Sequence, residues 1–218
     1  MAVRTDADTG STTSETPLPD GVAERTARLG VGLAAAVLVL LALRLPVWEA
    51  RLSAPQYPGG LRITAYGDRV VGDLREINEL NHYVGMEAFD PSDVPETRLW
   101  PLAIAAALGG VALGSLLGRH LFGRLVRLGL WFVPLGALAD VQFRLYQYGH
   151  SVDPEAPIRL EPFTPLVVGP TKVLNFTTWA YPGGAVWCLA GAAALVTCGP
   201  GVVRRTRGWL GSRGGAEG

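Results

Sequence analysis

Four long apolar stretches constrain this chain more than any other feature of its sequence. They cover residues 29–48, 99–117, 125–146 and 184–203. A membrane-spanning helix needs about 20 mostly apolar residues, so each stretch is long enough to cross a bilayer. Only 17% of the 218 residues are charged, against about 25% in a typical soluble domain. The sequence therefore predicts an all-α membrane protein with four transmembrane helices and two extracytoplasmic loops.

The basic residues predict how these helices are oriented. Arg25 precedes the first stretch, Arg124 lies between the second and third, and Arg205 follows the fourth. Positive charge collects in short cytoplasmic loops, so we expect both termini in the cytoplasm and the loops 49–98 and 147–183 outside. Lys172 is the single lysine among the basic residues, a bias that suggests a GC-rich bacterial genome. With the four apolar stretches, we therefore expect a multi-pass protein of the bacterial cytoplasmic membrane. Basic and acidic residues number 19 each, and this balance argues against a nucleic-acid partner.

The expected domain organisation is a single membrane domain with two tails. Residues 1–24 are rich in Thr, Ser, Asp and Pro and predict a disordered cytoplasmic tail. The membrane domain should cover residues 25–208, and residues 209–218 should form a second cytoplasmic tail. No convincing cleavage site follows the first stretch, so it is expected to be a retained signal anchor.

A glycine stripe runs along the second apolar stretch. Gly110, Gly114 and Gly118 recur every four residues, a spacing that lets another helix approach closely. Packing inside the helical bundle and docking of a partner protein are both compatible with this stripe, and packing is the simpler interpretation.

The first outer loop carries signals of local structure. Residues 61–66 alternate as a strand does, Gly67-Asp68 favours a tight turn, and residues 69–71 would form the returning strand. A helix should then begin at Asp73, with Asp73 and Glu76 forming a capping box.

That helix is expected to place Ile77, Leu80 and Val84 on one face and to stop at Gly85. The second outer loop contains many prolines, which predict an extended segment of restricted conformation.

Metal-ligating side chains are few, and they gather in the outer loops. Met86 follows His82 by four residues, and His150 lies in the second loop. Imidazole nitrogen and thioether sulfur together suit copper, in particular Cu(I). Residues four apart face one another on a helix, unless Gly85 breaks the turn. Ordinary packing residues would give the same spacing, so a metal site and a purely structural role both remain open.

Asp140 and Arg144 form the one obvious ionisable pair in the apolar stretches. They are four residues apart near the outer end of the third stretch and can neutralise one another. We expect a structural role at the membrane interface rather than a proton or ion path. The sequence shows no nucleophile and base constellation, no phosphate-binding glycine loop and no CxxCH haem motif. It therefore predicts a non-enzymatic protein without haem.

Both outer loops resemble a family of small bacterial membrane proteins. Residues 54–61 (APQYPGGL) and 76–86 (EINELNHYVGM) are similar to the family pattern AP-x-YP-x-GL followed by IN-x-LNHYIGM. The second loop adds Gly149-His150, residues 153–158 (DPEAPI) and residues 162–165 (PFTP). Members of this family are often encoded among accessory genes for nitrous oxide reductase, a copper enzyme of denitrification that matures outside the cytoplasmic membrane.

The resemblance implies a function and a site. The chain would be a non-enzymatic accessory membrane protein for extracytoplasmic copper handling or for nitrous oxide reductase maturation. Its implied partners, besides the lipid bilayer, are copper chaperones, an ABC exporter or nitrous oxide reductase itself. The transient copper ligands would be His82, Met86 and His150. The supporting residues would be Tyr57, Asn78, Asn81 and Tyr83.

Other functions compete with copper handling. In the main alternative the chain is a structural or scaffold subunit of a membrane complex, whose outer loops dock a protein without any metal. A transporter component would need a polar path through the helices, and a quinone-reactive module would need a redox centre. The sequence offers little for either.

Overall fold

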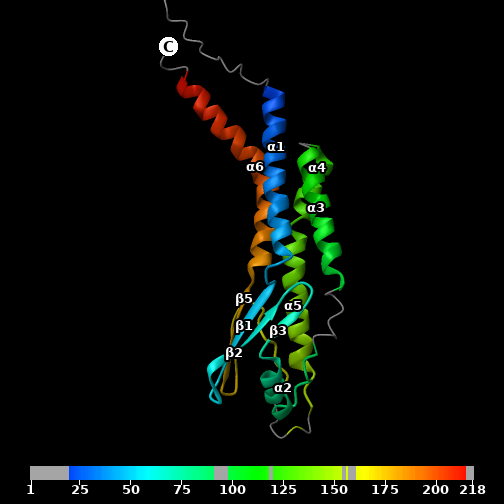
Figure 1. The fold of residues 1–218 in the computed structure, drawn as a ribbon, viewed down its shortest axis with the longest axis vertical. Coiled ribbons are helices and arrows are strands. Elements are labelled where there is room, and N and C mark those ends of the chain that lie inside the picture. Colours follow the sequence, from blue (N-terminus) through cyan, green and yellow to red (C-terminus); the bar gives the residue numbers. More distant parts are fainter. Residues whose placement is uncertain (1–19, 91–97, 118–119, 154–155, 157–160, 215–218) are drawn as a thin grey trace, which may run out of the picture.

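The computed structural model describes residues 20–90, 98–117, 120–153, 156 and 161–214. These residues form a layer of helices with an antiparallel sheet at one end (Figure 1). The helices are α1 (Asp20–Ala42), α2 (Leu74–Tyr83), α3 (Trp100–Leu116), α4 (Leu121–Gly129), α5 (Phe132–His150) and α6 (Gly184–Gly214). The strands are β1 (Trp48–Ala54), β2 (Tyr57–Ala65), β3 (Val70–Gly72), β4 (Gly169–Val173) and β5 (Phe176–Pro182). The protein is therefore mixed α/β, and the predicted all-α class is wrong.

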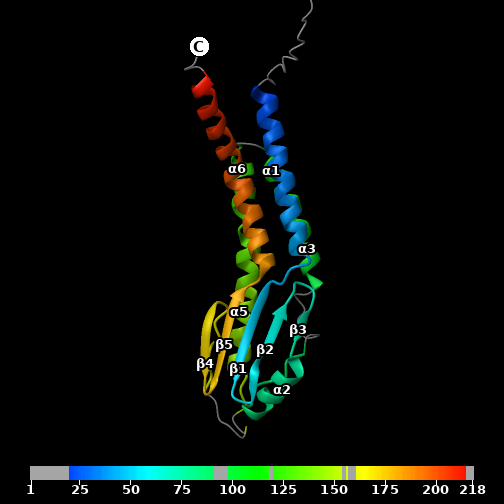
Figure 2. The same ribbon diagram turned by 60° about the vertical axis from the view of Figure 1, so that its left-hand side comes forward.

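Both predicted outer loops contribute to one five-stranded sheet. Its strand order is β3-β2-β1-β5-β4, and every neighbouring pair is antiparallel. The predicted hairpin is present as β2 and β3, and the Tyr66 amide donates to the Arg69 carbonyl at 2.8 Å across its turn. The central pairing of β1 with β5 joins the two loops (Figure 2). The second loop, expected as an extended segment, supplies two paired strands instead.

Its prolines are compatible with this pairing. Pro170 lies in β4, an edge strand, and Pro182 ends β5. A proline cannot donate a hydrogen bond to a neighbouring strand, so edges and strand ends are where sheets accept it. Proline content alone therefore gave a misleading signal for this loop.

Two helical segments are long and apolar enough to cross a membrane. They are Glu24–Ala42 within α1 and Leu121–His150, which covers α4 and α5. The apolar helices Trp100–Leu116 and Gly184–Gly199 are shorter. The prediction of four spans is corrected in this respect: by length and composition, only two helical segments of the described residues meet the requirement for a span.

Two of the predicted spans include residues that belong to the sheet domain. The first predicted span continued to Trp48, but α1 ends at Ala42 and Trp48 is the first residue of β1. In the third, Val141 and Leu145 of α5 pack against the sheet. Apolar residues that cover a sheet and apolar residues that face lipid look alike in sequence.

Small residues bring α1 and α6 close together. Ala35 and Ala42 of α1 are fully buried in one core with Ala185 and Ala193 of α6. A Cβ atom added at Gly199 would lie 2.8 Å from the nearest Val31 methyl group. Close approach of helix backbones through small residues is typical of helices packed in membranes.

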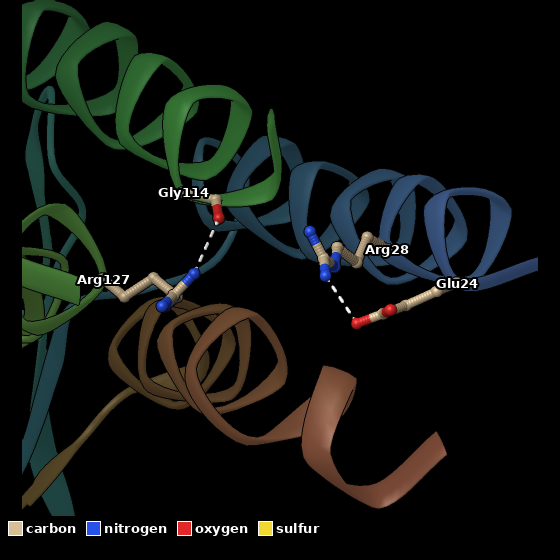
Figure 3. A network of polar contacts seen from close by, with 4 residues as sticks. All are labelled: Glu24, Arg28, Gly114 and Arg127. Carbon is tan, nitrogen blue, oxygen red and sulfur yellow. Dashed lines mark hydrogen bonds and ion pairs between the residues drawn. The ribbon is translucent and has the colours of Figure 1, made fainter. Parts of the chain in front are cut away.

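The glycine stripe of α3 packs inside the same helical layer. A Cβ atom at Gly110 would lie 2.7 Å from Leu130, and one at Gly114 would lie 3.0 Å from both Arg127 and Val196. Arg127 also donates a hydrogen bond to the Gly114 carbonyl at 3.1 Å (Figure 3). These contacts favour the packing interpretation. Gly118 lies outside the described residues.

Large apolar side chains are exposed over the helical layer. They include Leu33 at 69%, Leu102 at 66% and Phe132 at 75% exposure. Monomeric soluble proteins rarely expose contiguous apolar surface on this scale, whereas lipid would cover it. The first residues of α1 and the last residues of α6 both lie at the end of this layer opposite the sheet (Figure 1).

Candidate functional site

The sheet presents an apolar face toward α5 and α2. Because side chains alternate along a strand, β1 turns Trp48, Ala50 and Leu52 to this inner face. The other strands add Leu61, Ile63, Ala65, Val70, Thr171, Val173, Phe176 and Thr178. Together with α5 and α2, this face lines a partly open cavity of about 340 Å³. We call it the sheet cavity.

The helix α5 contributes the charged side chains of the sheet cavity. Asp140, Arg144 and Tyr148 recur every four residues along α5, and all three line the cavity. Asp140 and Arg144, which the sequence predicts at the membrane interface, lie beside the sheet. Trp100, at the helical end of the cavity, is 9% exposed. Its indole nitrogen is buried and finds no hydrogen-bond partner within the described part of the chain.

The helix α2 closes the far end of the sheet cavity. Ile77 and Val84 are buried, and Leu80 lines the cavity with them, so the predicted apolar face is confirmed. Asp73 is the N-cap residue, but its side chain makes no capping bond. Its carboxylate accepts a hydrogen bond from the Arg62 amide at 2.8 Å. The predicted capping box is therefore wrong, because Asp73 ties the helix start to β2 rather than to its own first turn.

Met86 lies where the two loops meet. It forms a β-bridge with Val152, and the Asp153 amide donates to the Gly85 carbonyl at 2.7 Å. Gly85 has φ +73, and a Cβ atom there would lie 2.4 Å from Ala156. A side chain at this position would be strained by the left-handed backbone and would clash. Gly85 therefore ends α2, as predicted, and lets the second loop approach Met86.

The predicted copper ligands do not share a cavity. Met86 lines the sheet cavity, whereas His82 and His150 are exposed and do not line it. The ring of His150 stacks on Tyr146 at 4.0 Å, and its Nδ1 lies 2.9 Å from the Tyr146 carbonyl. The described residues contain no group of three or more His, Cys, Asp and Glu side chains that could hold a metal ion.

Two of the predicted supporting residues hold the backbone beyond Met86. Asn78 donates to the Phe89 carbonyl at 3.0 Å and accepts from the Phe89 amide at 2.8 Å. Asn81 donates to the Glu87 carbonyl at 3.5 Å. Tyr83 is 60% exposed, with its ring at 6.2 Å from that of His82.

Tyr57, the remaining supporting residue, begins β2 and pairs with Ala54 beside a bulge in β1. The four predicted supporting residues therefore do not form one cluster. Of the four, Asn78 and Asn81 hold the backbone that follows Met86.

Sequence reasoning missed two anchors of the second loop. Gln142 of α5 donates to the Pro165 carbonyl and accepts from the Val167 amide, both at 2.9 Å. The Trp48 indole donates to the Val167 carbonyl at 2.8 Å. No sequence spacing reveals Gln142, whereas the strict alternation of residues 48–53 could have revealed β1.

The outer face of the sheet is polar, and its exposed basic side chains outnumber the half-buried Glu49 of β1 on the same face. It carries Arg51, Arg62 and Lys172, all exposed, and Trp179, which is 55% exposed. Arg51 lies directly opposite Arg62 on β2 and opposite Trp179 on β5. We call this row the basic outer face.

No protein-family model matches the chain, and no curated protein shows significant similarity to it. The family resemblance of the two loops therefore stays a hypothesis, and the functional argument rests on the structure.

Proposed function

We propose that this chain is a non-enzymatic accessory protein anchored in the bacterial cytoplasmic membrane, with its sheet outside and both termini in the cytoplasm. The two membrane-length helical segments and the exposed apolar side chains around them support the anchoring. Arg28 of α1 and Arg127 of α4 lie near one another on neighbouring helices (Figure 3). This agrees with positive charge on the cytoplasmic side.

Cysteine labelling on intact cells tests this orientation. In a background with Cys188 and Cys198 replaced by alanine, a membrane-impermeant maleimide should label Ser53→Cys in the sheet. It should leave Gly21→Cys, at the start of α1, unlabelled until the cells are opened. Labelling of Gly21→Cys but not of Ser53→Cys on intact cells would show that the orientation is the opposite of the one proposed.

The basic outer face supports a docking role in the maturation of nitrous oxide reductase. Arg51 and Arg62 are directly opposite one another, an arrangement that destabilises a sheet by charge repulsion. An acidic partner surface would relieve this repulsion. Trp179 beside them supplies the large aromatic contact that, with arginine, dominates binding energy in interfaces. The partner we propose is nitrous oxide reductase, docked through an acidic surface.

Binding of purified nitrous oxide reductase to the detergent-solubilised chain tests this docking. We expect binding that weakens with salt and falls at least tenfold for Trp179→Ala combined with Arg51→Glu. Arg75→Glu, a charge reversal at an exposed residue of α2, is the matched control and should bind as the wild type does. Docking elsewhere would be indicated by equal losses in the two variants, and absence of wild-type binding would refute the proposal.

Copper handling is the second candidate function. The bridge between Met86 and Val152 favours it, because this bridge brings together the two loops that carry the predicted ligands. Titration with Cu(I) should show stoichiometric binding that is lost in the His82→Ala/Met86→Ala variant. His120→Ala, which removes the histidine at the opposite end of the chain's helical layer, should bind copper normally. Equal binding in the two variants would exclude this site.

A further inference from the structure

The size and the apolar lining of the sheet cavity suggest that it holds a ligand. Its 340 Å³ falls within the range of about 300–1,000 Å³ that is usual for small-molecule sites. Buried water needs two to four polar partners, and most side chains lining this cavity are aliphatic or aromatic. The surroundings therefore favour an apolar occupant.

The cavity extends along α5 and across the inner face of all five strands. Lining residues of this helix run from Ala137 to Tyr148, eleven residue steps at about 1.5 Å each, or about 16 Å. The lining also includes Trp100, the first residue of α3, and Leu80 of α2. A hydrocarbon chain about 16 Å long could therefore lie along α5 beneath the sheet.

The charges around the cavity select against a charged chain. Asp140 and Arg144 are the charged side chains among the described lining residues, and they carry opposite signs. They lie one helical turn apart, so the wall has no net charge to attract an anion or a cation. A neutral hydrocarbon chain is the ligand class that such a wall admits.

The position of the cavity points to the source of that chain. Its lining includes Val47 and Trp100, which belong to the core of the helical layer, and Ala137, which packs against that core. The cavity thus begins where the helical layer ends and continues beneath the sheet. In a membrane-anchored protein, the hydrocarbon closest to this junction is lipid.

We propose that the sheet cavity binds an acyl chain of a membrane phospholipid. The proposal uses the membrane location but is independent of docking by the basic outer face. Bound lipid would fill the space between the sheet, α5 and α2. Failure of the docking experiment would leave this proposal intact, and the reverse also holds.

Photocrosslinking in proteoliposomes tests the proposal. The full chain is reconstituted with phosphatidylcholine that carries a diazirine near the end of one acyl chain, and adducts are located by peptide mass spectrometry. We expect adducts on residues 137–148 and on the inner face of β1 and β5. Adducts confined to the exposed side chains of α1 and α3 would show surrounding lipid only and would overturn the proposal.

A matched pair of variants on β5 provides the control. Thr178 lines the cavity, and its neighbour Thr177 does not. Thr178→Phe should fill part of the space and lower the yield of cavity adducts at least fivefold, while Thr177→Phe should leave it unchanged. Equal yields in the two variants would refute the site. Should Thr178→Phe fail to fold, the position of the adducts in the wild type still decides the question.

Discussion

At the scale of single residues, side-chain amides replace missing strand pairing in the sheet domain. Asn78 and Gln142 each donate to one backbone carbonyl and accept from one backbone amide, as a neighbouring strand would. Asn78 does so with a single residue, Phe89, while Gln142 spans Pro165 and Val167. Segments without a strand beside them are thereby fixed to α2 and α5.

Replacement of Gln142 tests this role. Gln142→Leu removes both hydrogen bonds and leaves a partly buried amide and carbonyl without their partners, which costs about 1–3 kcal/mol for each group left unsatisfied. We expect faster hydrogen exchange at the Val167 amide and a lower unfolding temperature in detergent. Gln147→Leu changes an exposed residue of the same helix and should alter stability by about 0.5 kcal/mol or less. Similar effects of the two changes would mean that the Gln142 bonds contribute little.

Residue-level prediction succeeded where the signal was local. The apolar face of α2 and its end at Gly85 were predicted correctly. Both features depend only on residues that are close in sequence: the helical spacing of apolar residues and a glycine that adopts a left-handed backbone. The Asp73 carboxylate was assigned to its own helix, but it bonds to Arg62 on a neighbouring strand. A partner of that kind depends on the tertiary fold and leaves no trace in local spacing.

At the scale of elements, the packing of α3 depends on glycine at defined positions. A Cβ atom at Gly110 would contact Leu130 at 2.7 Å, whereas one at the adjacent Gly109 would meet nothing within 4 Å. The two positions therefore differ in packing but share one helix and one residue type.

Leucine substitutions at these two glycines provide the test. Gly110→Leu should force α3 away from Leu130 and destabilise the helical layer by about 1–3 kcal/mol, the usual cost of overpacking. Gly109→Leu should be neutral or slightly stabilising, since leucine favours a helix more than glycine does. Thermal unfolding in detergent measures both effects. A greater loss for Gly109→Leu would contradict the arrangement of α3 described above.

The strands that were not predicted from the sequence are those whose partners lie far away along the chain. β2 and β3 are joined by a short turn and were recognised. β1 and β5 lie more than 120 positions apart, and their pairing of Ala50 with Ala180 has no local signature. The apolar residues at the start of β1 and in the second half of α5 were also counted as membrane spans, because burial beneath a sheet and burial in lipid select the same side chains.

At the scale of the whole molecule, the sheet is continuous with the helix pair that anchors it. The Gly183 amide donates to the Val47 carbonyl and the Ala185 amide to the Pro46 carbonyl, both at 2.8 Å. These two hydrogen bonds extend the pairing of β1 with β5 beyond the sheet, to the residues that connect β1 to α1 and β5 to α6. Sheet and helical layer are therefore fixed to one another at this junction.

The position of β5 in the chain sets an order on biosynthesis. β1 leaves the ribosome early, whereas its partner β5 follows about 120 residues later, or about 6–25 s at ordinary elongation rates. During that interval the central edge of the unfinished sheet has no neighbour, and an unpaired strand edge invites association with other chains. The nascent protein must therefore keep β1 from premature contacts until β5 has been synthesised.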